Sequence, residues 1–196
     1  MMTLPPVVIV PDVGDSARDW QRFANLSAHF TPDVVAIEPL GDSLAADAER
    51  VRAAIEAAVE PPIVMAHGYG ALAATVAANR RNTSLLIFVA GYMLDYGETI
   101  YDVVGGPSTS LTTTRVDTVG WRAIPTTYVV CRNDRRIART VQEQLANHRA
   151  TTIVELDAGE QPFRSHSEAL AQILHEELVA VRGGQLHAAL RVVKTA

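Results

Sequence analysis

The 196-residue chain has a single cysteine, Cys131, no run of like charges and no apolar stretch that approaches the length of a membrane span. One cysteine excludes an intrachain disulfide and a zinc site built from cysteines, and it favours a reducing compartment, so we expect a cytoplasmic protein. The lack of a basic run indicates no nucleic-acid partner, and the short apolar runs indicate no membrane partner. The first residues lack the basic and long apolar regions of a signal peptide.

What is present is typical of one globular domain. The chain is 48% hydrophobic and 20% charged, with a formal net charge of -5. A chain of this length can bury a sizeable hydrophobic core. We therefore expect residues 1–196 to form a single domain.

Short apolar runs alternate with segments of helical spacing along most of the chain. Continuous apolar strands are typical of parallel sheets buried on both faces, and strand–helix alternation predicts a doubly wound α/β fold with about six strands. The expected strands are residues 7–10, 34–37, 63–65, 85–89, 127–131 and 152–156. The expected helices between them are residues 16–30, 43–59, 136–148 and 167–181.

Two segments depart from this alternation. Residues 92–125 contain Gly97, the triplet 105–107 (Gly-Gly-Pro) and a polar run, which indicates either an insertion over a site or an ordinary surface loop with a short helix. Residues 185–196 follow Gly183-Gly184, which we expect to end the last core helix. This tail is interpreted as an extra helix, a homodimer contact or a frayed end.

The most informative motif is Ala66-His67-Gly68-Tyr69-Gly70. It follows an apolar run and precedes an alanine-rich helical segment, so it predicts a strand, a sharp turn and a helix. In the nucleophile elbow this geometry carries a serine at the tip of the turn. Here the tip is Gly68, which has no hydroxyl group and cannot attack a carbonyl.

Three further segments directly follow expected strands, in an order that also occurs in a known superfamily. They are residues 11–16 after the first strand, 131–134 (Cys-Arg-Asn-Asp) after the fifth and 157–165 after the sixth. With the elbow, they resemble the α/β-hydrolase superfamily, and most closely its small esterases and hydroxynitrile-lyase-like proteins. The resemblance covers nearly the whole chain. It implies the α/β-hydrolase fold, with residues 92–125 as a reduced cap.

The same comparison implies a degenerate catalytic triad. The family's serine is replaced by Gly68, its histidine by Glu160, and the His-Gly start of its oxyanion loop by Pro11-Asp12. Only the acid, at Asp134, remains. Because acyl transfer by a Ser-His-Asp triad needs both a nucleophile and a base, we do not expect it at these positions.

Glu160 is the main positive candidate for chemistry. At the histidine position it faces Asp134, so the two carboxylates repel, and one pKa is expected to rise as in a general acid–base pair. The alternative is that Arg132, Arg135 or Arg164 pairs with these acids in a relic site.

A metal site that uses Asp12, His67, Asp134 and Glu160 is conceivable, but no ligand-spacing motif supports it. We therefore expect no metal and no other cofactor.

Each remaining candidate has a structural and a functional interpretation. Gly68 either relieves strain in the turn or makes room for a substrate atom. His67 is a structural hydrogen-bonding residue or a catalytic one, and Asp134 caps a helix or belongs to the site. Tyr69 supplies a backbone N–H to an oxyanion hole whose other wall is the loop with Val13, while its ring packs on the helix.

Two functions fit this sequence, and both imply a small-molecule ligand. The first is a non-hydrolytic lyase, isomerase, dehydratase or cyclase that uses Glu160, oriented by Asp134, on a small apolar carbonyl compound. The second is a catalytically inactive pseudo-hydrolase that binds or assembles, and an esterase is a distant third. We favour the first, because an ionisable residue replaces the histidine while Asp134 remains.

Overall fold

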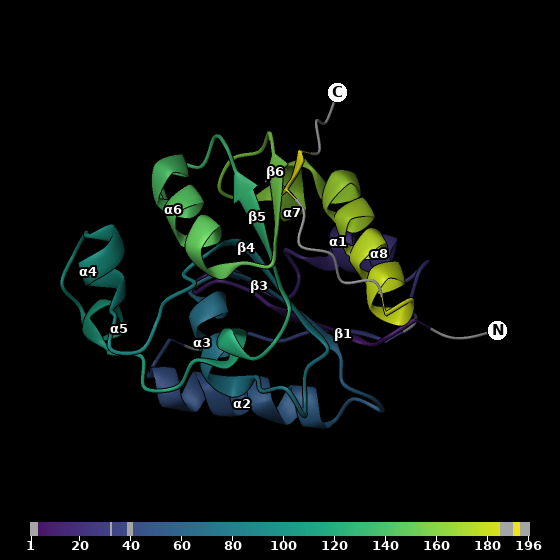
Figure 1. Ribbon diagram of the computed structural model, residues 1–196, viewed down its shortest axis with the longest axis horizontal. Coiled ribbons are helices and arrows are strands. Elements are labelled where there is room, and N and C mark those ends of the chain that lie inside the picture. Colours follow the sequence, from purple (N-terminus) through teal and green to yellow (C-terminus); the bar gives the residue numbers. More distant parts are fainter. Residues whose placement is uncertain (1–3, 32, 39–40, 185–189, 193–196) are drawn as a thin grey trace.

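The core of the molecule is a parallel seven-stranded sheet in the order β2-β1-β3-β4-β5-β6-β7 (Figure 1). The computed structural model describes residues 4–31, 33–38, 41–184 and 190–192. All six predicted strands are present, and a seventh joins them. The strands are β1 (Val7–Val10), β2 (Val34–Ala36), β3 (Ile63–Gly68), β4 (Leu85–Gly91), β5 (Thr126–Cys131), β6 (Thr152–Leu156) and β7 (Leu190–Val192).

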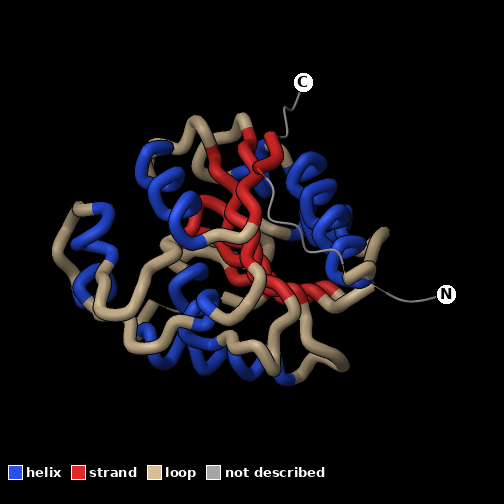
Figure 2. Tube along the Cα trace, in the orientation of Figure 1, coloured by secondary structure: helices blue, strands red, loops and turns tan. Residues whose placement is uncertain are grey.

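Helices cover both faces of the sheet, as the strand–helix alternation predicts (Figure 2). One face carries α2 (Leu44–Glu56), α3 (Gly70–Ala77) and α6 (Arg139–Arg149). The other carries α1 (Gln21–Ser27), α7 (Pro162–Ser165) and α8 (Ser167–Arg182). Among the described residues, no helix is both long and apolar enough to cross a membrane.

Local sequence explains where these elements begin and how they pack. Ser43 caps α2, since its hydroxyl accepts a hydrogen bond from the Ala46 N–H at 3.2 Å. Successive strand residues alternate between two buried clusters: Val8 packs with α2 and α3, whereas Val7 and Ile9 pack with α1 and α8. The sheet is therefore buried on both faces, which is why its strands are continuously apolar.

The predicted helix in the tail is wrong for Leu190–Val192, which form β7. This strand pairs in parallel with β6, and Leu190 lies opposite Ile153. The apolar–polar alternation of the tail fits a strand as well as a helix, and the open backbone edge of β6 favours the strand. Residues 185–189 and 193–196 lie outside the described residues, so the homodimer contact stays a prediction.

Residues 92–125 form a short insertion beside the sheet. It contains α4 (Ile100–Val104), α5 (Ser110–Thr113) and the 3-10 helix η1 (Gly120–Arg122), and α4 and α5 lie apart from the helical layers (Figure 1). Arg149 of α6 anchors it through two hydrogen bonds of 2.7 Å to Glu98. The Trp121 indole N–H also donates to the Leu94 carbonyl at 2.8 Å.

The ion pair between Glu98 and Arg149 leads to a prediction about the free energy of unfolding. Burial alone raises the pKa of Glu98, but hydrogen bonds from Arg149 and from the Asp95 N–H outweigh it and lower the pKa below its ordinary 4.5. A lowered pKa means that the stabilisation is present above the unfolded value and is lost as the pH falls through the folded value. We expect Glu98→Gln to lower the free energy of unfolding by about 2 kcal/mol at neutral pH.

Urea unfolding of both proteins across the pH range measures this effect. The difference between wild type and Glu98→Gln is expected to shrink below pH 4.5. Glu49→Gln is the control, because its partner Arg52 lies on an exposed surface and such pairs contribute less than about 1 kcal/mol. A difference that is constant with pH would contradict the prediction.

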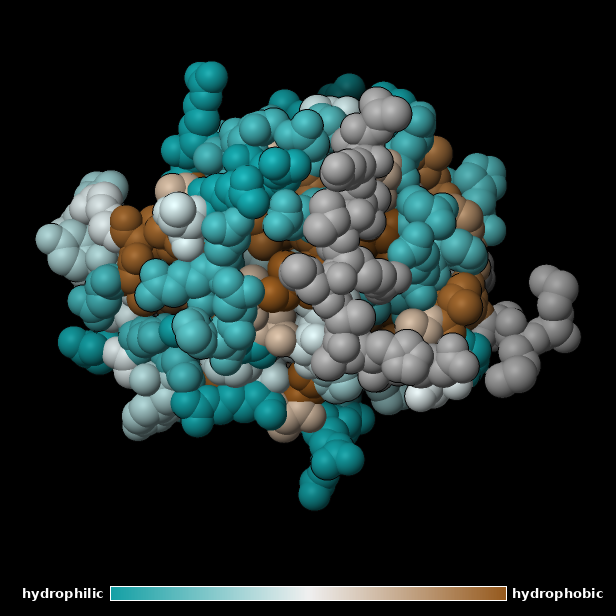
Figure 3. All heavy atoms as spheres, turned by 45° about the horizontal axis from the view of Figure 1, so that its top comes forward, coloured by the Kyte–Doolittle hydropathy of each residue, from teal (hydrophilic) through white to brown (hydrophobic). Residues whose placement is uncertain are grey.

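Exposed large apolar side chains are scattered over the surface. Figure 3 shows hydrophilic residues over most of the face that it presents, with hydrophobic ones in separate small areas. Single exposed apolar residues are normal for a globular protein. Those with the largest exposure are Val13, Val35, Val59, Tyr96, Tyr101 and Val179.

Candidate functional site

The candidate residues meet at the carboxyl edge of the sheet. Asp12 follows β1, Gly68 ends β3, Asp134 follows β5 and Glu160 follows β6. Parallel strands end at one edge of their sheet, and ligand sites of open α/β folds lie there. The strand that precedes or contains each of these residues was therefore predicted correctly from the sequence. The geometry of their side chains determines which chemistry the site allows.

The turn between β3 and α3 has the backbone of a nucleophile elbow. Gly68 at its tip has a φ of +52°, in the left-handed region. A Cβ on Gly70 would lie 2.4 Å from the Val10 carbonyl oxygen, so β1 and α3 approach too closely for any side chain. A Cβ on Gly68 would lie 2.4 Å from Asp12 Cγ and 2.6 Å from Arg136 Nη2. Backbone atoms therefore exclude a side chain at position 70, whereas at position 68 the neighbouring atoms belong to side chains and the positive φ favours glycine.

The Asp12 carboxylate fills the place beside Gly68. Its Oδ1 accepts hydrogen bonds from the backbone N–H of Tyr69 at 2.7 Å and of Val13 at 2.8 Å. The residue is only 3% exposed. In an elbow of this kind, the N–H after the tip and an N–H of the facing loop form the oxyanion hole. Asp12 thus places a negative charge where those two donors converge.

Arg136 holds the other side of this carboxylate. Its Nη2 donates to Asp12 Oδ2, and its Nη1 lies 3.7 Å from Glu160 Oε1. The Arg136 side chain is 37% exposed. Burial lowers the pKa of its guanidinium, while the Glu160 charge acts to raise it. One arginine therefore bridges a buried and an exposed carboxylate.

Arg136 was not predicted from the sequence to be a site residue. Among the arginines considered as partners of the site acids, Arg132 pairs instead with Glu155, and Arg164 pairs with Asp19. The only sequence signal for Arg136 is its place in the same short loop as Asp134. That signal could not separate it from its neighbour Arg135.

Asp134 is buried and accepts three hydrogen bonds. Its Oδ1 accepts the N–H of Arg136 at 2.7 Å and of Ile137 at 3.1 Å, and its Oδ2 accepts from Gln142 Nε2 at 3.3 Å. It thus caps the turn before α6, which begins at Arg139. Burial raises the pKa of Asp134, and the charge of Glu160 adds to the shift. This is the direction expected for one member of the carboxylate pair.

Glu160 itself points toward solvent and toward Arg136. Its side chain is 47% exposed, so the insertion leaves the carboxylate in contact with water. Tyr92, which follows β4, lies near both acids: burial, then the charges of Asp134 and Glu160, raise the pKa of Tyr92 to about 12. The two carboxylates therefore share one neighbourhood, although only Asp134 is desolvated.

His67 lies beneath the elbow and is fully engaged. Its Nδ1 is 3.2 Å from Asp15 Oδ2, and its Nε2 is 2.8 Å from the Glu160 carbonyl oxygen. Each ring nitrogen therefore faces an oxygen atom, one of a carboxylate and one of a carbonyl. Edge contacts with the rings of Trp20 and Phe163 enclose it. His67 therefore ties the loop after β1 to the loop after β6.

Two other features bear on ligands. Across the described ranges, no three His, Cys, Asp or Glu side chains are grouped so as to hold a metal ion.

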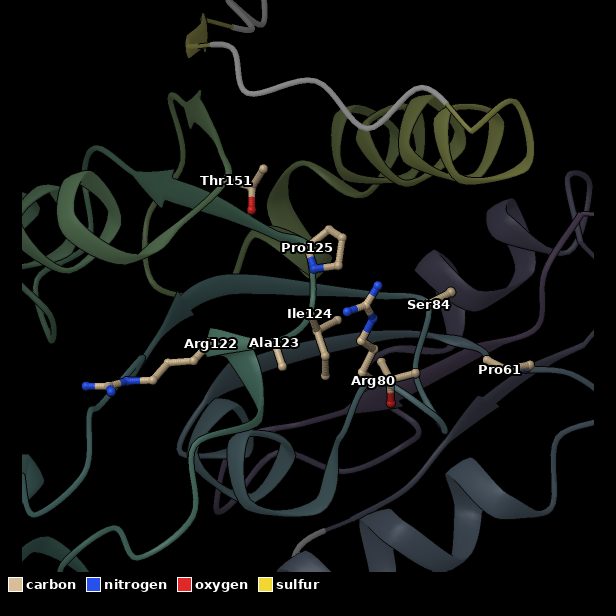
Figure 4. Close-up of a pocket in the computed structure, with 9 residues that line it drawn as sticks. Pro61, Arg80, Ser84, Arg122, Ala123, Ile124, Pro125 and Thr151 are labelled. Atoms are coloured by element: carbon tan, nitrogen blue, oxygen red, sulfur yellow. The ribbon is translucent and has the colours of Figure 1, made fainter.

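A surface hollow of about 630 Å³ lies at the opposite edge of the sheet, where β4, β5 and β6 begin (Figure 4). Arg122 points away from it and pairs with Asp95. The residues drawn there are Pro61, Arg80, Thr83, Ser84, Arg122, Ala123, Ile124, Pro125 and Thr151.

Comparisons with known proteins agree on the fold. No family model matches the sequence, and no curated protein matches it. Among solved structures, a pyrethroid hydrolase from Sphingobium faniae matches with a TM-score of 0.73 at 15% identity, covering 91% of this chain and 98% of that one. Polyneuridine aldehyde esterase matches with a TM-score of 0.72 at 11% identity, covering 89% and 99%.

An extracellular α/β-hydrolase from a Paenibacillus species gives a TM-score of 0.68 at 10% identity, over 88% of this chain and 98% of that one. The chain therefore has the α/β-hydrolase fold, as the sequence motifs predict. Its similarity in sequence to these enzymes is too low to carry their activities over.

Proposed function

We propose that this protein is a pseudo-hydrolase, which keeps the α/β-hydrolase fold and elbow but binds a small molecule instead of hydrolysing it. One observation carries the proposal: the Asp12 carboxylate accepts the N–H groups of Tyr69 and Val13 beside a tip residue, Gly68, that has no side chain. The chain thus offers no nucleophile at the tip, and its oxyanion donors already bind an anion.

The energetic argument is direct. Hydrolysis of an ester places a negative charge on the carbonyl oxygen, and loss of one hole donor costs about 2.7–4 kcal/mol of transition-state stabilisation. Here Asp12 engages both donors, and its own charge repels a second anion. Arg136 neutralises Asp12, but its guanidinium lies at the position that a serine side chain would need.

The acid–base enzyme is the second candidate, and the raised pKa of Asp134 near Glu160 favours it. Other contacts weigh against it. Glu160 is half exposed and lies beside the cationic Arg136, so its carboxylate is not enclosed in a desolvated pocket. Asp134 already accepts three hydrogen bonds, and His67 has an acceptor on each ring nitrogen. We therefore prefer the pseudo-hydrolase.

The wild-type protein is expected to be inert toward p-nitrophenyl esters and toward fluorophosphonate probes. The measurements are initial rates of ester hydrolysis and intact-mass spectrometry after incubation with the probe. Stoichiometric labelling of a nearby serine such as Ser16 or Ser165 would overturn the proposal. So would turnover of a carbonyl compound that Glu160→Gln abolishes, which would establish the acid–base enzyme instead.

A further inference from the structure

We propose that the oxyanion hole of this chain is a carboxylate-binding site that Asp12 occupies as an internal ligand. The inference rests on the proposed absence of hydrolysis and names the ligand class of the same site. When the Asp12 carboxylate is absent, the site takes a small monocarboxylate such as acetate or formate from solution.

The contacts around Asp12 are those of a carboxylate receptor. Two backbone N–H groups converge on Oδ1 at 2.7 and 2.8 Å, and the Arg136 guanidinium donates to Oδ2. Charge-assisted hydrogen bonds of this kind are roughly twice as strong as neutral ones. The carboxylate is also nearly free of solvent, since the residue is 3% exposed. The Tyr69 N–H and the Arg136 guanidinium come from distant parts of the chain and recognise the carboxylate group itself, whereas the Val13 N–H belongs to the residue that follows Asp12.

The space matches the same ligand. A Cβ on Gly68 would lie 2.4 Å from Asp12 Cγ, so the absent side chain leaves room for the carboxylate. The Asp12 side chain beyond its Cα has the size of acetate. Truncation of Asp12 to alanine therefore leaves a space of about the size of formate, bordered by the Tyr69 and Val13 N–H groups and by Arg136.

Asp12 also explains why the site is closed in the wild-type protein. A tethered group competes at an effective concentration in the millimolar range or above, so a free carboxylate must displace it. The turn after β1 fixes that tether, because the Asp15 N–H donates to the Asp12 carbonyl oxygen at 3.1 Å. Asp12 therefore keeps carboxylates from solvent out of the site in the wild-type protein.

Chemical rescue of Asp12→Ala tests the proposal in the full chain. Thermal unfolding is followed in increasing sodium formate, with sodium chloride replacing it at constant ionic strength. We expect Asp12→Ala to melt below wild type, and formate to raise its Tm by about 4 °C at concentrations well above its Kd, because a ligand that binds only the folded state stabilises it by an amount that grows with the logarithm of its concentration. Wild type is expected to show no formate-specific shift.

Two matched variants complete the design. Asp12→Ala with Arg136→Met lacks the cation, so we expect no formate-specific shift in Tm. Asp95→Ala removes an acid from an exposed ion pair with Arg122 and likewise is expected to show no shift.

Several results would overturn the proposal. One is a folded Asp12→Ala protein without a formate-specific rise in Tm, and another is an equal rise in wild type or in Asp95→Ala. If Asp12→Ala is unfolded in chloride, refolding in formate and in chloride at equal ionic strength decides: recovery only in formate supports the site, and no recovery in either overturns it. Ester turnover by wild type is a separate readout, so failure of the proposed function is distinguishable.

Discussion

Arg136→Met is expected to lower the free energy of unfolding by about 3 kcal/mol. Removal of one partner of a buried ion pair costs about 3–5 kcal/mol, because the other charge stays buried without compensation. The low end applies, since the Arg136 side chain is 37% exposed and Asp12 keeps its two backbone hydrogen bonds. Urea unfolding at neutral pH, followed by circular dichroism, measures the loss.

Arg139→Met is the matched control. Arg139 lies three residues further along, is 40% exposed and pairs with Glu143 and Glu155. Its exposure is close to that of Arg136, but its partners Glu143 and Glu155 are more exposed to solvent than Asp12. We expect a loss below about 1 kcal/mol, as for surface pairs. Equal losses in Arg136→Met and Arg139→Met would show that the Asp12 carboxylate is not held by this pair.

The fold could be predicted because the apolar sequence of its strands indicates that they are buried. Runs such as Val7–Val10 are apolar at every position, which only a sheet covered on both faces explains. β7 could not be predicted in the same way. Its three residues are too few for a periodicity, and its pairing depends on the open edge of β6, which is a property of the assembled sheet.

The loops that form the site could be predicted from the sequence, but the contacts of their side chains could not. Because parallel strands end at one edge, the motifs that hold Asp12, Gly68, Asp134 and Glu160 had to meet there. From the sequence, Asp12 was only part of a changed start of the oxyanion loop. Its position in the oxyanion hole depends on the conformation of the turn after β1 and on the reach of Arg136, and both are set by tertiary packing.

That difference changes the preferred function. From the sequence, Glu160 replaces the histidine and leads to an acid–base enzyme. In the structure, Asp12 and Gly68 are complementary. The absence of a side chain on Gly68 leaves space for the Asp12 carboxylate, and Arg136 balances the charge of that carboxylate. This matched set supports the proposed pseudo-hydrolase and accounts for a buried acid beside the Tyr69 and Val13 N–H groups.

The matched set predicts how esterase activity could be built. Gly68→Ser with Glu160→His supplies a nucleophile and a base beside Asp134. We expect at most weak ester hydrolysis from this double variant, because the new Cβ would crowd Asp12 Cγ and the hole would stay occupied. Addition of Asp12→Ala releases both oxyanion donors. Arg136 then loses its buried partner, and its flexible end can move away from the tip.

We expect the triple variant to hydrolyse p-nitrophenyl acetate at least about 10²-fold faster than the double variant, since removal of even one hole donor costs 10²–10³ in rate. A fluorophosphonate should label position 68 in the triple variant only. Gly68→Ser with Asp12→Ala is the control for the base, because it frees the hole while Glu160 remains. If the double variant is as active as the triple, Asp12 does not block the hole in solution, and the carboxylate site falls with it.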